Sequence, residues 1–446
     1  MLVSFLLFNL FAIKYSVFKP FGFNRCVKVI NSCLKVRTFL LRIFIWNFKE
    51  LNKYKTMIRL FCFALLMISI PACSQTLLVK QTIQCGAEQT EIYLSMLKGK
   101  RVAVMANQTS IVGNRHLVDT LVSLGVNVTT IFSAEHGFRG NEADGAIISD
   151  GKDEVTGLPV ISLYGKNKKP IPEQLNEIDI VVFDIQDVGV RFYTFISSLH
   201  YLMEACAENG TELLVLDRPN PNGNYIDGPI LEKGFESFVG MHPVPVVHGM
   251  TVAEYARMIN GEKWLKDSLQ CNLKWVSCRN YTHDTEYAPP VPPSPNLPNY
   301  QSIRLYPSLA FFEGTMVSEG RGTDFPFQVF GYPGYGAGDF EFTPVIRVGA
   351  SVHPKFENQV CRGVDLRYYS PPGGEWNKLR LKWLFDAYES SPDKENFFKP
   401  YFDKLAGTDQ LRRNIQAGMG IDEIRIKWVE GINSYREVRE KYLLYE

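Results

Sequence analysis

Short apolar segments that alternate with helical patterns constrain the fold of this chain most. Residues 101–106, 126–132, 178–185 and 213–216 are predicted strands, since each is a short apolar run. Residues 116–124, 195–208 and 251–260 have the spacing of amphipathic helices. Strands that are apolar throughout suit burial on both faces of a parallel sheet. The alternation therefore predicts an α/β chain built from βαβ units.

A proline-rich segment indicates where this first region ends. Residues 289–298 hold six prolines, a composition typical of a stiff, extended stretch rather than a helix. We therefore expect a Rossmann-like parallel sheet domain over residues 80–288 and a linker over residues 289–299. A smaller mixed α+β domain is expected over residues 300–446.

The first 73 residues differ in character from the rest. Residues 1–56 carry ten Lys or Arg and one acid, Glu50, and lack regular periodicity, so they are interpreted as an extension or a mis-assigned start. Residues 57–73 have a basic head, an apolar run and small residues before Cys73, the layout of a signal peptide with a lipobox. We expect an exported protein, in the periplasm or as an outer-membrane lipoprotein anchored through a lipidated Cys73.

Charge and short motifs exclude several classes of protein. The net charge of +1 gives no general attraction to nucleic acid. The chain has no Walker loop, no G-x-S-x-G elbow, no H-E-x-x-H and no dinucleotide fingerprint, so neither a cofactor nor a metal is predicted. Cysteines 85, 206, 271, 278 and 361 are odd in number and do not suggest a disulfide framework, although Cys271 and Cys278 are close enough in sequence to pair.

Polar side chains follow the predicted strands, where ligands bind in open α/β sheets. We therefore expect one cleft that collects side chains from several loops. The candidates are Asn107, Glu135, His136, Asp184, Asp187, Arg191, Tyr193, Asp217, Arg218, Asn220, His248 before a helix, and Glu319 and Arg321 from the second domain. Several of these acids also fit a network of caps and ion pairs, and their spacing is not diagnostic of a metal. Glu313 competes with Glu319 as the carboxylate from the second domain.

These segments together resemble the bacterial exo-β-N-acetylmuramidases, glycoside hydrolase family 171, formerly a domain of unknown function. The resemblance runs from about residue 80 to the C-terminus. It rests on residues 107–109, 134–140, 184–189, 191–194, 216–221, 248–251, 293–296, 313–315 and 318–323. It implies a Rossmann-like domain with a C-terminal auxiliary domain and a cleft between them. It also implies release of β-1,4-linked N-acetylmuramic acid (MurNAc) from non-reducing ends of peptidoglycan fragments.

Glycoside hydrolysis usually needs two carboxyl groups around the scissile bond. We expect Glu135 to act as the general acid and Glu319 as its partner. Asp184, Asp187 and Asp217 remain alternatives to Glu319. MurNAc carries a lactyl carboxylate, for which Arg191, Arg218 and Arg321 are candidate partners, and Tyr193 is expected to stack on the sugar.

Two other classes of function remain open on the sequence alone. A non-catalytic protein that binds muropeptides would use the same cleft, although neutral sugars need few carboxylates. A Rossmann-like transferase or phosphatase is less favoured, because no phosphate-binding loop is present.

Overall fold

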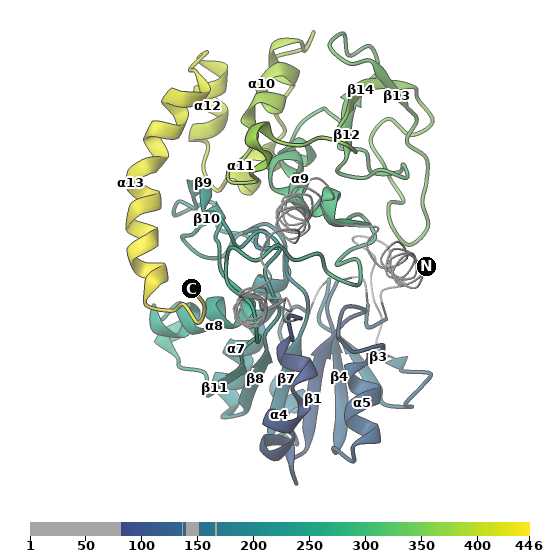
Figure 1. Cartoon of the computed structure of the whole chain (residues 1–446), viewed down its shortest axis with the longest axis vertical. Coiled ribbons are helices and arrows are strands. Elements are labelled where there is room, and N and C mark those ends of the chain that lie inside the picture. Colours follow the sequence, from purple (N-terminus) through teal and green to yellow (C-terminus); the bar gives the residue numbers. More distant parts are fainter. Residues whose placement is uncertain (1–81, 136, 140–150, 166) are drawn as a thin grey trace, which may run out of the picture. The chain divides into compact units, whose positions relative to one another are not determined.

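The computed structural model describes residues 82–135, 137–139, 151–165 and 167–446. A seven-stranded sheet with the order β11-β8-β7-β1-β4-β6-β5 organises the first part of this region (Figure 1). Its strands are β1 (Val102–Ala106), β4 (Val128–Ser133), β5 (Gly151–Lys152), β6 (Pro159–Ser162), β7 (Ile180–Asp184), β8 (Glu212–Leu216) and β11 (Leu273–Val276). Only the edge strand β5 among them is antiparallel to its neighbour.

The six parallel strands follow the Rossmann order. Counted along the chain they lie as 3-2-1-4-5-6, from β6 through β4 and β1 to β7, β8 and β11. The order reverses between β1 and β7, and in such sheets the ligand binds outside the carboxyl ends of the strands near that point. The predicted parallel, Rossmann-like sheet is thus confirmed.

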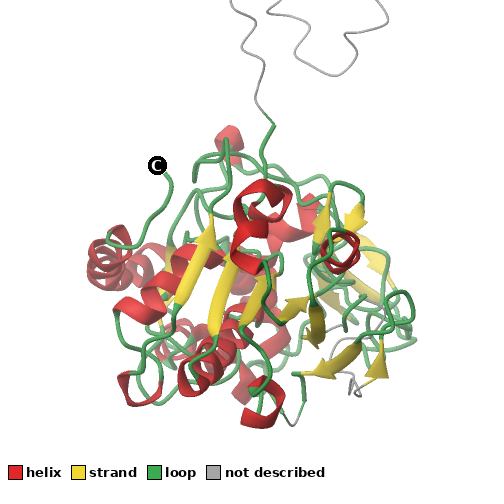
Figure 2. Ribbon diagram, turned by 90° about the horizontal axis from the view of Figure 1, so that it is seen from below, coloured by secondary structure: helices red, strands yellow, loops and turns green. Residues whose placement is uncertain are grey.

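Alternate residues of the strands enter two separate cores, as the two-residue period of a strand requires. Val104 and Val182 face a core that is completed by α4 (Thr90–Leu97) and α5 (Leu117–Ser123). Met105 and Phe183 face the opposite core, which α7 (Phe195–Asn209) covers. Helices therefore lie on both sides of the sheet (Figure 2). This part also contains the short strands β2 (Ile111–Val112), β3 (Arg115–His116), β9 (Asp227–Ile230) and β10 (Pro245–Val247) and the α-helices α6 (Pro172–Leu175) and α8 (Val252–Gly261). Its 3₁₀ helices, labelled η, are η3 (Gly86–Glu88) and η4 (Lys266–Ser268).

The C-terminal part combines helices with a three-stranded antiparallel sheet of order β12-β14-β13. Its elements are α9 (Tyr300–Leu309), η5 (Ala310–Gly314), β12 (Val329–Tyr332), β13 (Phe340–Phe342), β14 (Cys361–Asp365), η6 (Pro372–Gly374), α10 (Leu381–Glu389), α11 (Pro400–Ala406), α12 (Gln410–Gln416) and α13 (Ile421–Glu440). The core on the α7 side continues into this part and includes Phe312 and Tyr435. The two parts share one hydrophobic core, and the proposed domain boundaries stay a prediction.

The local signals at helix ends act as the sequence indicates. Thr251 caps α8, where its hydroxyl accepts from the Glu254 amide and the Glu254 carboxylate accepts from the Thr251 amide. Gly210 ends α7 in the left-handed conformation.

The five cysteines from Cys85 onward are free and buried, so Cys271 and Cys278 do not pair. Among the residues described, no helix combines the length and the apolar character needed to cross a bilayer. Residues 1–56, the signal segment 57–73 and Cys73 lie outside the described residues.

Candidate active site

A cavity of about 280 Å³ lies where loops from the large sheet meet the C-terminal part. On the sheet side, loops after β4, β6 and β7 supply Glu135, Tyr164, Tyr193 and Thr194. The proline-rich segment adds Ser294 and Asn296, and the C-terminal part adds Tyr306, Glu313 and Arg321. The cavity therefore combines two carboxylates and one guanidinium with aromatic walls, close to the lower limit of ~300 Å³ for small-molecule sites.

Glu135 is half-buried and held by two hydroxyl groups. The Tyr164 hydroxyl donates to Oε1 of Glu135 at 2.6 Å, and the Thr194 hydroxyl donates to Oε2 at 3.0 Å. Hydrogen bonds to both oxygens stabilise the ionised carboxylate and fix its direction. The sequence named Glu135 but missed Tyr164 and Thr194, although Thr194 directly follows the predicted residue Tyr193.

The second carboxylate at the cavity is Glu313, not Glu319. Glu313 lies 3.4 Å from Nη2 of Arg321. The Glu319 side chain is only 4% exposed and lies behind Arg321, 3.4 Å from its Nε and 3.1 Å from Nζ of Lys355. Lys355 also donates to the carbonyls of Phe312 and Val317. Glu319 is thus placed to orient Arg321, while Glu313 shares the cavity with Glu135.

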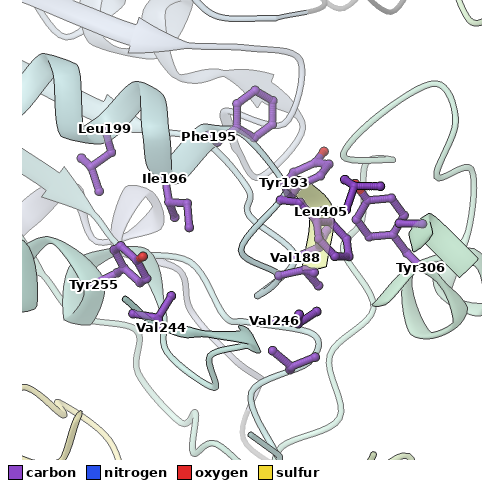
Figure 3. Close-up of a cluster of buried hydrophobic side chains, with 14 of the residues drawn as sticks. Val188, Tyr193, Phe195, Ile196, Leu199, Val244, Val246, Tyr255, Tyr306 and Leu405 are labelled. Atoms are coloured by element: carbon purple, nitrogen blue, oxygen red, sulfur yellow. The ribbon is translucent and has the colours of Figure 1, made fainter. Parts of the chain in front are cut away.

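Aromatic rings shape the cavity walls. The rings of Tyr193 and Tyr306 meet edge to face with centroids 5.9 Å apart, and Figure 3 shows the two side chains at one end of the buried cluster. The Tyr193 hydroxyl donates to the carbonyl of Pro293, so the proline-rich segment is tied to the sheet side of the cavity. The Arg321 guanidinium lies 5.0 Å from the centre of the Phe327 ring, which also lines the cavity. These fixed rings provide apolar surface for a sugar ring.

Asp184 and Arg218 form a buried ion pair outside the cavity lining. Nε and Nη2 of Arg218 donate to the two oxygens of Asp184 at 2.6 and 2.9 Å. Burial alone would lower the pKa of the Arg218 guanidinium. The attraction of the Asp184 carboxylate is larger than this effect, so the pKa is raised above its usual value. This pair joins the ends of β7 and β8, and the structure does not bring either side chain to the cavity.

Arg191 is likewise enclosed and committed to backbone. Its guanidinium donates to the carbonyls of Pro229, Val244, Leu405 and Ala406. Because the side chain is fully buried, the pKa of Arg191 falls to about 9. Arg191 therefore joins the first part of the molecule to the end of α11 and does not line the cavity.

The predicted acids Asp187 and Asp217 also lie inside the protein. Asp187 accepts from the amide of Gly189, and burial raises the pKa of its carboxyl to about 7. Asp217 accepts from the amide of Ala253 and the hydroxyl of Tyr445, and burial raises its pKa to about 6. Both carboxyls hold loops at the sheet edge, away from the cavity lining.

Asn107, Asn220 and His248 complete the set that lies away from the cavity. Asn107 Oδ1 accepts from the amide and hydroxyl of Thr109. Asn220 packs against Gly189. A Cβ atom at position 189 would lie 2.2 Å from the side-chain Oδ1 of Asn220, so only glycine fits there. His248 is fully buried, which lowers the pKa of its ring to about 3, and its Nδ1 accepts from the Met250 amide. The predicted residue His136 lies outside the described residues.

The structure thus separates the predicted residues into two groups. Glu135, Tyr193 and Arg321 line the cavity together with the competing candidate Glu313. The remaining described candidates lie outside the cavity lining, where they form hydrogen bonds or ion pairs with neighbouring segments. Among them, Glu319 forms an ion pair with Arg321. Two carboxylates beside aromatic surface fit a site for glycoside chemistry, which needs paired carboxyl groups.

Comparisons with known proteins agree with this site. Residues 102–301 match the family model "Exo-beta-N-acetylmuramidase NamZ, N-terminal", and residues 304–445 match the C-terminal model of the same family. The chain is 38% identical over 371 residues to the peptidoglycan beta-N-acetylmuramidase NamZ of Bacillus subtilis (strain 168), covering 79% of this chain and 89% of that protein.

Two solved structures show the same fold. They are DUF1343 family proteins of Bacteroides fragilis NCTC 9343, 46% and 30% identical to this chain, with TM-scores of 0.77 and 0.71. Each comparison covers 82% of this chain and 99% of the other. Since the two family models together span most of the sequence, the chain belongs to the exo-beta-N-acetylmuramidase NamZ family of glycosidases.

Proposed function

We propose that this enzyme is an exo-acting glycoside hydrolase that releases terminal β-1,4-linked MurNAc from non-reducing ends of peptidoglycan fragments. The observation that carries the proposal is a cavity in which Glu135, Glu313 and Arg321 lie together among aromatic rings. The cavity volume suits one sugar residue rather than a run of several, as removal of a terminal residue requires.

Glu135 and Glu313 are the two carboxyl groups of the proposed mechanism. The hydroxyl donors of Tyr164 and Thr194 favour the charged form of Glu135, which suits a nucleophile or a base better than the general acid predicted from the sequence. Glu313 lies 3.4 Å from the Arg321 guanidinium, and a neighbouring cation opposes protonation of a carboxyl. Gln variants at both positions, tested with an activated leaving group, therefore decide which carboxyl donates the proton to the leaving oxygen. A carboxyl separation of ~5–5.5 Å would accompany retention and ~6.5–9.5 Å inversion of configuration.

Arg321 is the proposed partner of the lactyl carboxylate that distinguishes MurNAc from N-acetylglucosamine. Of the three arginines predicted for this role, only Arg321 lines the cavity. A guanidinium can donate two parallel hydrogen bonds to a carboxylate. Glu319 and Glu313 hold Arg321 from two directions, so its orientation is fixed before substrate binds.

We expect the purified enzyme to release MurNAc from the disaccharide MurNAc-GlcNAc and to leave GlcNAc-GlcNAc largely intact. Arg321→Gln should lower kcat/KM on the MurNAc disaccharide by ~10–100-fold, the loss expected when a hydrogen bond to a charged group is removed. The residual rate on GlcNAc-GlcNAc should stay the same. Products are measured by liquid chromatography with mass spectrometry.

Two further variants give this experiment its controls. Arg321→Lys keeps the charge but loses the paired donors, so an intermediate loss is expected. Arg347→Gln makes the same charge change at an exposed pair with Asp324 and should behave as wild type. Binding of MurNAc-GlcNAc without any turnover would instead support a non-catalytic muropeptide-binding protein. An equal loss on both disaccharides would contradict the role given to Arg321.

We also propose that residues 57–73 direct export and that Cys73 is lipidated, which would place the enzyme in the periplasm or on the outer membrane. The support is the basic, apolar and small-residue order of this segment. In cells fed a clickable fatty acid, the wild-type chain should be labelled and Cys73→Ser should not. Equal labelling of both would contradict the lipid anchor.

A further inference from the structure

The side-chain amide of Asn296 is a group at the cavity that the proposed mechanism does not use. Asn296 lines the cavity that holds Glu135, and the residue is only 2% exposed. Its Nδ2 donates to the carbonyl of Ala350 at 2.9 Å. A carbonyl oxygen can only accept a hydrogen bond, so the nitrogen of the amide must be the atom that faces Ala350. The Oδ1 atom of Asn296 therefore points away from Ala350.

This oxygen is an acceptor that a ligand can reach. In the described part of the chain, no group donates a hydrogen bond to Oδ1 of Asn296, and the protein does not enclose this atom completely. Ala350, which holds Nδ2, does not line the cavity, so Oδ1 is the polar atom of the side chain that is left to face it. A largely buried acceptor without a donor is costly, and a ligand in the cavity can supply that donor.

The loop that carries Asn296 is fixed on both sides. The Tyr193 hydroxyl donates to the carbonyl of Pro293 just before it. The Leu297 amide donates to the carbonyl of Ser294 at 2.9 Å, which closes a turn around Asn296. A binding group that its surroundings hold in place loses little freedom when the ligand arrives. The direction of Oδ1 is thus set before binding.

The other acceptors at the cavity are held by other groups. Glu135 accepts from two hydroxyls, and Glu313 pairs with Arg321. A sugar hydroxyl both donates and accepts, whereas the N–H of an acetamido group only donates and so needs an acceptor. Leu297 follows Asn296, is buried and lines the same cavity, so apolar surface for an acetyl methyl group lies next to the free acceptor.

We propose that Asn296 recognises the N-acetyl group of the substrate, because its Oδ1 accepts from the N–H of the 2-acetamido group on the terminal sugar. This assignment rests on the proposed function, in which that sugar is MurNAc. It divides recognition between two residues. Arg321 binds the lactyl carboxylate, and Asn296 binds the acetamido group on the neighbouring carbon of the ring.

Two ligands of the same shape test this contact. They are MurNAc and its 2-(2-oxopropyl) analogue, in which a CH₂ group replaces the N–H. The wild-type protein should bind the analogue ~10-fold or more weakly, because a largely buried acceptor then has no donor. Asn296→Leu has an apolar side chain of similar size and should bind the two ligands with nearly equal affinity. Dissociation constants come from ligand-detected NMR titrations, which need no turnover.

Two variants serve as controls. Asn296→Asp keeps an oxygen acceptor but loses the donor to Ala350, and it should still prefer MurNAc over the analogue. Asn433→Leu makes the same change as Asn296→Leu at an exposed position of α13 and should bind both ligands as wild type does. The comparison of the two ligands on the wild-type protein decides the question even if Asn296→Leu does not fold.

Equal affinity of the wild-type protein for the two ligands would overturn the inference, since a hydroxyl would then be the donor to Oδ1. A preference that persists in Asn296→Leu, or that is lost in Asn296→Asp, would overturn it as well. Turnover of MurNAc-GlcNAc together with equal binding of the two ligands would reject the acetamido contact and leave the proposed hydrolysis standing. Preferential binding of MurNAc without turnover would reject the hydrolysis and leave the contact standing.

Discussion

Replacing Glu135 with Gln should lower kcat on MurNAc-GlcNAc by about 10³-fold or more. The amide keeps the size of the side chain but can neither act as a base or nucleophile nor carry a proton for transfer, and such groups contribute ~10²–10⁴-fold to rates. One of the two hydroxyls, of Tyr164 or Thr194, can donate to the amide oxygen of Gln, and the other can accept from its NH₂ group. We therefore expect the variant to fold and to bind substrate with little change in KM. Initial rates over a range of substrate concentrations provide the measurement.

A substrate with an activated leaving group separates the possible roles of Glu135. A 4-nitrophenyl MurNAc glycoside needs little help from a general acid, so loss of an acid would be largely masked on it. If Glu135 is the nucleophile or base, as its hydroxyl donors favour, Glu135→Gln should be impaired on both substrates. Glu341→Gln, an exposed position on β13, serves as the matched control. Full activity of Glu135→Gln on both substrates would end this assignment.

Asp184→Asn should destabilise the protein by ~3–5 kcal/mol, the usual effect of removing one partner of a buried ion pair. The side chains of Asp184 and Arg218 are 0% and 2% exposed, so the variant leaves the Arg218 charge in the interior without its counter-ion. The free energy of unfolding is measured by urea denaturation, with the m-value checked for two-state behaviour. Since neither residue lines the cavity, kcat of the folded fraction should change little.

Two comparisons make this stability experiment decisive. Asp324→Asn breaks the exposed pair with Arg347 and should cost less than ~1 kcal/mol. Asp184→Leu combined with Arg218→Met removes both charges and should recover part of the lost stability. A loss below ~1 kcal/mol for Asp184→Asn would show that Arg218 finds another counter-charge when Asp184 is neutral.

The sequence predicts the sheet well because its central strands are apolar on both faces. Residues 178–185 and 213–216 were expected as strands and correspond to β7 and β8. The strands that escaped prediction lie toward the edges. β11 carries Lys274 and the partly exposed Trp275, and β6 has only four residues. Edge strands need less apolar surface, so their pattern is weaker.

The site was harder to predict than the fold, because polar residues after strands have two uses. Asp184 and Asp217 resemble Glu135 in sequence, because each acid lies at or just past the end of a strand. In the structure, both aspartates fix neighbouring loops, and Glu135 lines the cavity. The choice between Glu313 and Glu319 depends on the fold of residues 312–331 and on Lys355, far away in sequence. Sequence spacing does not encode such a contact.

The last helix, α13, supplies hydrogen-bond donors to loops in the first part of the chain. Tyr435 and Arg439 of α13 donate to the carbonyls of His248 and Gly249, and the Tyr445 hydroxyl donates to the carboxylate of Asp217. The sheet edge thus obtains several of its partners only after the ribosome has passed residue 445. Before that point, water is the hydrogen-bond partner of the Asp217 carboxylate and of the His248 and Gly249 carbonyls. The hydrogen bonds that fix these loops in the folded protein therefore cannot all form until residue 445, which lies 228 positions after Asp217, has been added to the chain.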